Sequence, residues 1–251
     1  MSEQKQPDLA RRDFLTRGAA VATAGLAVAP GVMLYGVAQA KPDDQAVTSK
    51  VRWGMLVDTT KCSNGCTACV DACNQFNGLG NEEHSNAQQR TQYIRKVELR
   101  NKATGETHSL PMMCQHCENP PCADVCPTGA SFKRADGIVL VDRHICIGCR
   151  YCMMACPYKA RSFVHEELHD QKPYNPRGKG CVESCNMCVS RVDEGKQPAC
   201  VEACAADGSN AIIFGDLNDP NSEIAQRLAK YASTEIRADL GLNTGVRYQG
   251  I

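Results

Sequence analysis

The 251-residue sequence has no long run of one charge sign, and its 28 basic and 28 acidic residues cancel. A nucleic-acid binder held by phosphate contacts needs a basic patch or stripe, so that class of protein is excluded. The chain also lacks a G-x-G-x-x-G motif, a phosphate loop, a G-x-S-x-G motif and a C-x2-C-H haem motif. We therefore expect no catalytic residues here and assign any substrate chemistry to another protein.

Residues 1–40 have the pattern of an export signal. The adjacent pair Arg11 and Arg12 precedes an uncharged stretch from Gly18 to Ala40, and no second stretch long enough to span a membrane follows. The arginine pair is typical of the twin-arginine route, which exports folded chains. This predicts a periplasmic protein at the outer face of the cytoplasmic membrane. A retained membrane anchor is the alternative, although Pro30 interrupts the apolar stretch.

Cysteine is the residue in excess, with 17 copies. Sixteen of them fall into four groups of four: Cys62, Cys66, Cys69 and Cys73; Cys114, Cys117, Cys122 and Cys126; Cys146, Cys149, Cys152 and Cys156; Cys185, Cys188, Cys200 and Cys204. An odd total prevents complete disulfide pairing within the chain. The repetition predicts that most cysteines share another use.

The third group has the spacing C-x2-C-x2-C-x3-C-P, which is the bacterial ferredoxin pattern. In this pattern three cysteines hold one 4Fe-4S cluster and the fourth reaches a neighbouring cluster. The motifs must then work in pairs, so four groups predict two pairs and four 4Fe-4S clusters.

Three other uses of cysteine fit the spacing less well. Tetrahedral zinc needs only two C-x2-C pairs and gives no role to the third cysteine or to the Cys-Pro ending. Cysteines so close in sequence are poor structural disulfides, because a disulfide stabilises mainly by closing long loops. A thioredoxin-like site would be a single C-x2-C motif.

The seventeenth cysteine is Cys181, four residues before Cys185. Its spacing to Cys185 is the same as that from Cys62 to Cys66, so spacing alone does not decide which of the two is a ligand. We favour Cys185 and expect Cys181 to be a free thiol.

Turn and strand signals surround the cysteine groups. Asp136-Gly137 predicts a hairpin turn before the third group, and segments 93–100 and 106–110 predict an inserted hairpin. Residues 166–180 are rich in proline and glycine and predict a loop. After Asp219-Pro220, the residues Ile224, Leu228 and Tyr231 predict one apolar face of a short helix that begins at the proline.

With these residues in view, the chain resembles the four-cluster ferredoxin-like subunits of membrane respiratory complexes, the NrfC-, PsrB- and TtrB-like electron-transfer subunits. The segments that carry the resemblance are Cys-Gln-His-Cys-Glu-Asn-Pro-Pro-Cys and Cys-Ile-Gly-Cys-Arg-Tyr-Cys-Met-Met-Ala-Cys-Pro-Tyr. The arginine pair, Asn-Gly-Leu after the first group and the ending Gly-Val-Arg-Tyr-Gln-Gly-Ile are most similar to the exported iron-sulfur subunit of a complex in dissimilatory sulfur metabolism.

The family pairs the outer groups with each other and the inner groups with each other. The resemblance thus implies four ligand sets: Cys62, Cys66, Cys69 and Cys204; Cys73, Cys185, Cys188 and Cys200; Cys114, Cys117, Cys122 and Cys156; Cys126, Cys146, Cys149 and Cys152. The extra residue between Cys62 and Cys66 departs from the usual C-x2-C opening.

The resemblance implies an α+β fold of two ferredoxin-like modules, each with two 4Fe-4S clusters. The expected parts are a signal peptide (1–40), an outer module (51–80 plus 181–216), an inserted hairpin (81–112), an inner module (113–165), a loop (166–180) and a C-terminal helix and tail (217–251).

The implied function is electron transfer without a substrate site of its own. The implied neighbours are an NrfD-like integral membrane subunit, linked to quinone, and a multihaem cytochrome c, with attachment to the membrane through these partners. The iron-sulfur subunit of an exported molybdopterin reductase is the alternative.

Several side chains near the inner groups are candidates for contacts with the clusters. Basic residues gather there and either compensate cluster charge, dock an acidic partner or are merely solvated: Lys133, Arg134, Arg143, Arg150, Lys159 and Arg161. We expect His116 to donate a hydrogen bond rather than bind iron, because its tetrad is complete. Tyr151 and Tyr158 are equally well explained by packing.

Overall fold

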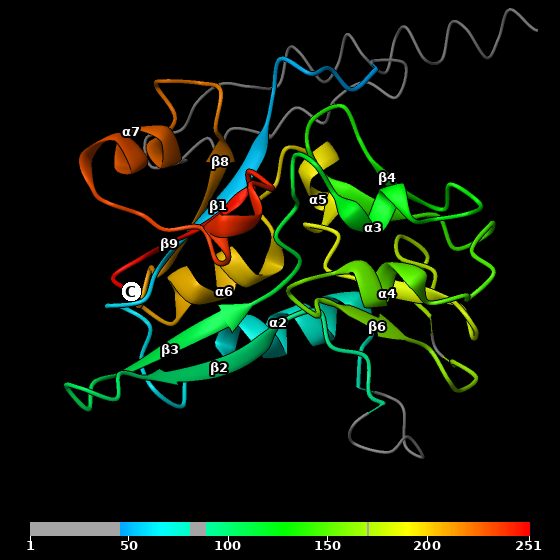
Figure 1. Cartoon of the computed structure of the whole chain (residues 1–251), viewed down its shortest axis with the longest axis horizontal. Helices are drawn as coiled ribbons and strands as arrows, with labels where there is room; N and C mark the ends of the chain where they lie inside the picture. The colour runs from blue at the N-terminus through cyan, green and yellow to red at the C-terminus, as the bar shows by residue number, and fades with distance from the viewer. Residues whose placement is uncertain (1–45, 81–88, 170) are drawn as a thin grey trace, which may run out of the picture. The chain divides into compact units, whose positions relative to one another are not determined.

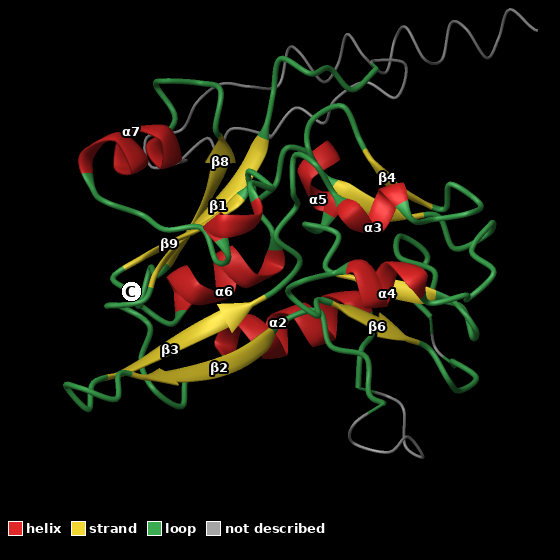
Figure 2. Cartoon of the chain, in the orientation of Figure 1, coloured by secondary structure: helices red, strands yellow, loops and turns green. Residues whose placement is uncertain are grey.

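The computed structural model describes residues 46–80, 89–169 and 171–251, all of which belong to one compact unit (Figure 1). The expected signal peptide lies outside the described residues. None of the described helices is both long enough and apolar enough to cross a membrane. Short helices and small sheets alternate along the chain (Figure 2).

The largest sheet has three strands in the order β8-β1-β9. Strand β1 (Trp53–Asp58) is antiparallel to β8 (Ile212–Asp216) and parallel to β9 (Val246–Gln249). The apolar run of β1 is buried on both faces, as expected of a central strand. This sheet leads directly into the first cysteine group.

Three two-stranded sheets complete the strand pairing of the described residues. They are antiparallel: β2 (Arg95–Arg100) with β3 (Thr107–Met112), β4 (Ser131–Lys133) with β5 (Val139–Val141), and β6 (Arg161–Phe163) with β7 (Val182–Ser184). The turn between β4 and β5 contains Asp136-Gly137. Strands β2 and β3 fall in the segment where the sequence predicts an inserted hairpin.

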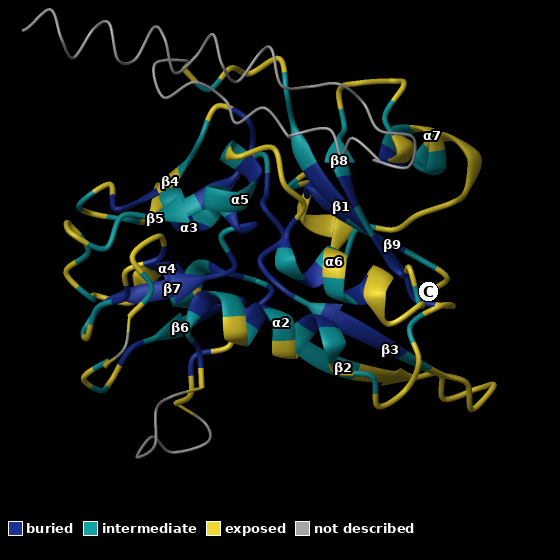
Figure 3. Cartoon of the chain, turned by 180° about the vertical axis from the view of Figure 1, so that it is seen from behind, coloured by how far each residue is buried: buried dark blue, intermediate teal, exposed yellow. Residues whose placement is uncertain are grey.

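The described helices are α2 (Ala68–Asn77), α3 (Pro121–Asp124), α4 (Tyr151–Ala155), α5 (Val189–Asp193), α6 (Ala199–Ala206), α7 (Glu223–Lys230) and a 3-10 turn η1 (Ala238–Leu240). Helices α2, α3, α4 and α6 carry cysteines of the four groups. Helix α2 packs against α6, and α3 packs against α4. The buried residues concentrate where these helices meet the strands (Figure 3).

The C-terminal helix differs from expectation at both of its ends. Helix α7 begins at Glu223 and is capped by Ser222, whose Oγ accepts a hydrogen bond from Ala225 N–H, so the helix does not begin at Pro220. Ile224 is fully buried, but Tyr231 ends the helix and is exposed. Beyond the helix, β9 adds a strand to the largest sheet.

Candidate functional site

The first outer group of cysteines is gathered by two packed helices. Helix α2 carries Cys69 and helix α6 carries Cys204. Burial raises the pKa of Cys69 to about 11; Lys96 lowers it, and Cys62, Cys204 and Cys66 raise it in turn. These four cysteines are therefore electrostatic neighbours, although they are up to 142 positions apart.

The second outer group uses the other cysteine of each helix, Cys73 and Cys200. Burial raises the pKa of Cys185 well above its usual value, and Cys73, Cys200 and Cys188 raise it further. Because Cys69 and Cys73, like Cys200 and Cys204, are one helical turn apart, each helix contributes one thiol to each neighbourhood.

Four thiols of the second and third cysteine groups line one cavity. The cavity is lined by Cys114, Cys117, Cys122 and Cys156, together with Pro120, Tyr158 and Arg161 among others. Burial raises the pKa of Cys117 to about 12, and the three other thiols raise it further.

A second inner cavity is lined by Cys126, Cys146, Cys149 and Cys152. Cys149 is the one exposed cysteine of the 17. The wall beyond the cysteines is formed largely by the loop Ile147, Gly148 and Arg150 and by Ser131. This thiol group therefore lies next to the surface.

Nitrogen donors point at several of these sulfur atoms. The Lys96 ammonium donates to Cys62 Sγ at 2.8 Å, and the Arg161 guanidinium donates to Cys122 Sγ at 3.0 Å. The backbone N–H of Ala211 donates to Cys204 Sγ at 3.2 Å. Among the described residues, no three His, Cys, Asp or Glu side chains converge on a single metal ion. Sets of four thiols with nitrogen donors to their sulfur atoms suit a 4Fe-4S cluster.

Cys181 lies apart from the four sets. Its Sγ is 3.3 Å from the carbonyl oxygen of Arg143 and 3.9 Å from that of Cys146, and it lines neither of the two inner cavities. Its role as a free thiol stays a prediction.

His116 is buried in its neutral form. Its Nδ1 accepts a hydrogen bond from Val139 N–H at 3.0 Å, which places the proton on Nε2. Burial, followed by the charge of Arg161, lowers the pKa of His116 to about 3. Within the described part of the chain, Nε2 has no hydrogen-bond partner. Tyr158 lines the cavity around Cys117, whereas Tyr151 is exposed.

The six basic residues near the inner groups have different surroundings. Two of them form ion pairs: Lys133 with Glu118, and Arg134 with Asp136 and Asp193. Arg143 hydrogen-bonds Asn175 and Tyr93, Arg150 lies over the Phe163 ring, and Lys159 is exposed. Arg161 donates to the Cys122 sulfur. Arg161 is the one of the six that hydrogen-bonds a cysteine sulfur.

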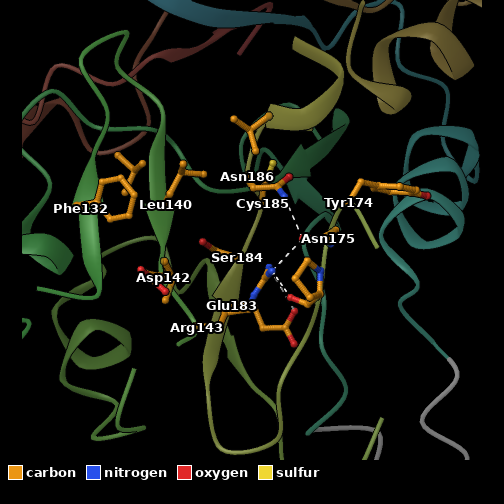
Figure 4. Close-up of a pocket in the computed structure, with 14 residues that line it drawn as sticks. Phe132, Leu140, Asp142, Arg143, Tyr174, Asn175, Glu183, Ser184, Cys185 and Asn186 are labelled. Carbon is orange, nitrogen blue, oxygen red and sulfur yellow. Dashed lines mark hydrogen bonds and ion pairs between the residues drawn. The ribbon is translucent and has the colours of Figure 1, made fainter. Parts of the chain in front are cut away.

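A pocket of about 250 Å³ with a polar network in its wall has no counterpart in the sequence analysis (Figure 4). Arg143 donates to Asn175 Oδ1 at 3.0 Å, and the fully buried Glu183 accepts from Tyr93 at 2.7 Å and from Arg177 at 3.0 Å. Charge pairing makes the burial of Glu183 tolerable. No short motif marks this network, because its members are up to 90 residues apart.

Fold and thiol arrangement together define an iron-sulfur protein of ferredoxin-like type. Two families described as 4Fe-4S dicluster domain match the chain, one over residues 61–130 and the other over residues 106–216.

Whole-chain relatives carry the identification further. The chain is 38% identical to the Hdr-like menaquinol oxidoreductase iron-sulfur subunit 1 of Archaeoglobus fulgidus, over 96% of this chain and 97% of that protein. It is 37% identical to Protein NrfC of Escherichia coli, over 92% and 91%. It is 34% identical to a tetrathionate reductase subunit of Salmonella typhimurium, over 97% and 89%. The chain belongs to this family of iron-sulfur electron-transfer subunits of oxidoreductase complexes.

Proposed function

We propose that the sixteen grouped cysteines hold four 4Fe-4S clusters and that the chain relays single electrons along them. The ligand sets are those that the family resemblance implies, two in the outer module and two in the inner module. The observation that carries the proposal is the convergence of these cysteines in space: helices α2 and α6, which carry Cys69, Cys73, Cys200 and Cys204, pack together, and the inner thiols line two cavities.

Each cluster supplies one-electron redox chemistry when bound. The protein holds the clusters through the thiolates, and its N–H donors stabilise negative charge on the sulfur atoms. Lys96 does so at Cys62, and Asn77 at Cys73, where its amide nitrogen is 3.5 Å from Sγ. The chain itself then needs no substrate site.

Iron and sulfide analysis with EPR spectroscopy of the purified chain tests the cluster count. We expect about sixteen iron atoms per chain, four per cluster, and four one-electron signals. Zinc in place of iron, or fewer than four clusters in the fully loaded protein, would contradict the proposal. Turnover of a small-molecule substrate by the isolated chain would contradict its assignment as an electron-transfer subunit.

Within the family, we assign the chain as a DsrO-type subunit of a DsrMKJOP-like membrane complex in dissimilatory sulfur metabolism. Residues 1–40 would export it by the twin-arginine route to the periplasm, where it would connect an NrfD-like quinone-linked subunit with a multihaem cytochrome c. The similarity to a menaquinol oxidoreductase subunit over nearly the whole chain supports a quinone-linked role.

An apolar surface beside the exposed Cys149 supports an integral membrane neighbour. Ile147 is 68% exposed and Met154 is 77% exposed, and Ile145 and Tyr151 are exposed beside them in sequence. Large exposed apolar side chains grouped in this way are typical of interaction surfaces. Replacing Ile147 and Met154 together by serine should release the chain from the membrane fraction without changing its iron content. Retention on the membrane would contradict this contact.

A second candidate is the iron-sulfur subunit of an exported molybdopterin reductase, favoured by the 34% identity to a tetrathionate reductase subunit. Purification of the native protein from membranes in mild detergent, followed by mass spectrometry, separates the two. A polytopic membrane subunit with haem c supports the first assignment. A large molybdopterin subunit overturns it in favour of the second.

A further inference from the structure

Arg161 lies between the two inner cavities. It begins strand β6 and is only 6% exposed. Its Nη2 donates to Cys122 Sγ at 3.0 Å and to Ser131 Oγ at 2.7 Å. Cys122 lines one cavity, while Ser131 lines the other. One guanidinium group thus contacts the walls of both.

Arg161 lies next to a thiol of each cavity. Its side chain makes a hydrogen bond with Cys152 as well as with Cys122. Cys152 lines the cavity opposite to that of Cys122. The positive charge therefore lies beside one ligand in each proposed set.

A buried guanidinium needs an anionic partner, because moving an unpaired charge out of water is costly. None of the ion pairs between described residues includes Arg161. Cysteine sulfurs take the place of a carboxylate in its surroundings. Its Nη1 is buried without a hydrogen-bond partner in the described part of the chain, while the residue forms part of a cavity wall.

We propose that Arg161 is a positioning residue shared by both inner clusters, and that it raises the reduction potentials of both. The inference rests on the proposed cluster sites. Reduction adds one negative charge to a cluster, and a buried positive charge beside its thiolates favours the reduced form. The free Nη1 donor supplies a further hydrogen bond to the group that fills the cavity. Arg161 thereby makes both inner clusters easier to reduce.

Lys159 provides a matched control for net charge. It lies two positions before Arg161, but it is exposed and lines neither inner cavity. Its removal changes the charge of the chain as much as removal of Arg161 does. Solvent screens a charge at the surface, so Lys159 should have little effect on either cluster.

The experiment is an EPR-monitored redox titration of the full chain carrying Arg161→Gln, Arg161→Lys or Lys159→Gln, with iron content measured on each sample. In Arg161→Gln we expect two of the four potentials to fall. At fixed applied potential, the reduced-to-oxidised ratio of those clusters should fall by about tenfold, equivalent to about 59 mV for a one-electron couple. Arg161→Lys keeps the charge without the guanidinium fork and should give a smaller fall in the same two potentials. Lys159→Gln should change each ratio by less than about twofold.

Unchanged potentials in Arg161→Gln would overturn the inference, as would a change in one potential only or an equal change in all four. Where Arg161→Gln loses clusters, Arg161→Lys decides the question, because both inner potentials must still fall together. Fewer than four clusters in the unmodified chain would instead contradict the proposed function. Failure of the proposed function can therefore be told apart from failure of the inference about Arg161.

Discussion

Gly148 lies in the loop between Cys146 and Cys149 with a φ of +70°, which favours glycine. A Cβ atom at this position would be 2.2 Å from the carbonyl oxygen of Gly180. The loop can approach the neighbouring backbone only because this residue has no side chain. The cavity around Cys126 therefore depends on one glycine that is not a ligand.

We predict that Gly148→Ala lowers iron content by about one cluster, four iron atoms per chain, because the loop must move away from Gly180. Gly129→Ala is the matched control: its φ is +69°, but nothing lies near the added Cβ. The control carries the backbone strain alone, about 1 kcal/mol. Iron analysis checks both variants. Equal iron content in the two would show that the contact with Gly180 is unimportant.

Cys181 is predicted to be a free thiol that leaves all four clusters intact when it is changed. Its Sγ points at backbone oxygens of Arg143 and Cys146, and serine retains a donor for them. Cys181→Ser should preserve iron content, whereas Cys185→Ser should lower it. A loss of about four iron atoms in Cys181→Ser would transfer the ligand role from Cys185 to Cys181.

At the scale of elements, β9 connects the end of the chain to the strand that precedes the first cysteine group. Tyr248 is fully buried in it; its hydroxyl donates to the Pro111 carbonyl at 3.1 Å and accepts from Gln115 at 3.2 Å. Gln115 lies in the second cysteine group. One side chain of the C-terminal strand therefore joins the largest sheet to the inner module.

We predict that Tyr248→Ala destabilises the folded chain by about 3–5 kcal/mol, as other buried aromatic truncations do. Tyr231→Ala is the control, because Tyr231 is exposed and its contacts with Arg227 and Lys230 are worth about 1 kcal/mol or less. Thermal unfolding at one scan rate measures the difference, at about 2–4 °C per kcal/mol for a chain of this size. Equal unfolding temperatures would show that β9 contributes little.

At the scale of the whole molecule, cysteine forms an unusual share of the interior. Twelve of the 17 cysteines are buried, and ten of these twelve join a single core with Met55, Ile138 and Met187 among other apolar residues. Burial raises the pKa of Cys114 to about 12, so without a cluster its thiol is neutral at pH 7. The interior is thus organised around groups that prefer thiolate ligands.

Removing iron under anaerobic, reducing conditions should abolish cooperative unfolding of the described core, because cluster binding contributes folding free energy. Circular dichroism during thermal unfolding, before and after chelation, measures the change. Reconstitution with iron and sulfide should restore the transition, and zinc should not. An apo chain that unfolds at the temperature of the loaded chain would contradict a structural role for the clusters.

The sequence by itself indicated iron-sulfur chemistry and the approximate positions of the loops that carry the cysteines. Ligand spacing is local, so the ferredoxin pattern at Cys146 and the turn at Asp136-Gly137 are visible without a structure. The family was likewise accessible from the cysteine segments. The contiguous matches over residues 61–130 and 106–216 agree with that class but do not test the expected module boundaries.

Only the tertiary structure decided which distant residues meet. The hairpin's Lys96 reaches Cys62, β9 pairs in parallel with β1, and Arg161 lies between two cavities. In the sequence, Arg161 is one of six basic residues near the inner cysteine groups. Charge alone does not distinguish a solvated side chain from a buried one. The physical reason is that packing across long separations, which no spacing encodes, fixes burial and hydrogen bonding, and these in turn set the electrostatics of each cluster site.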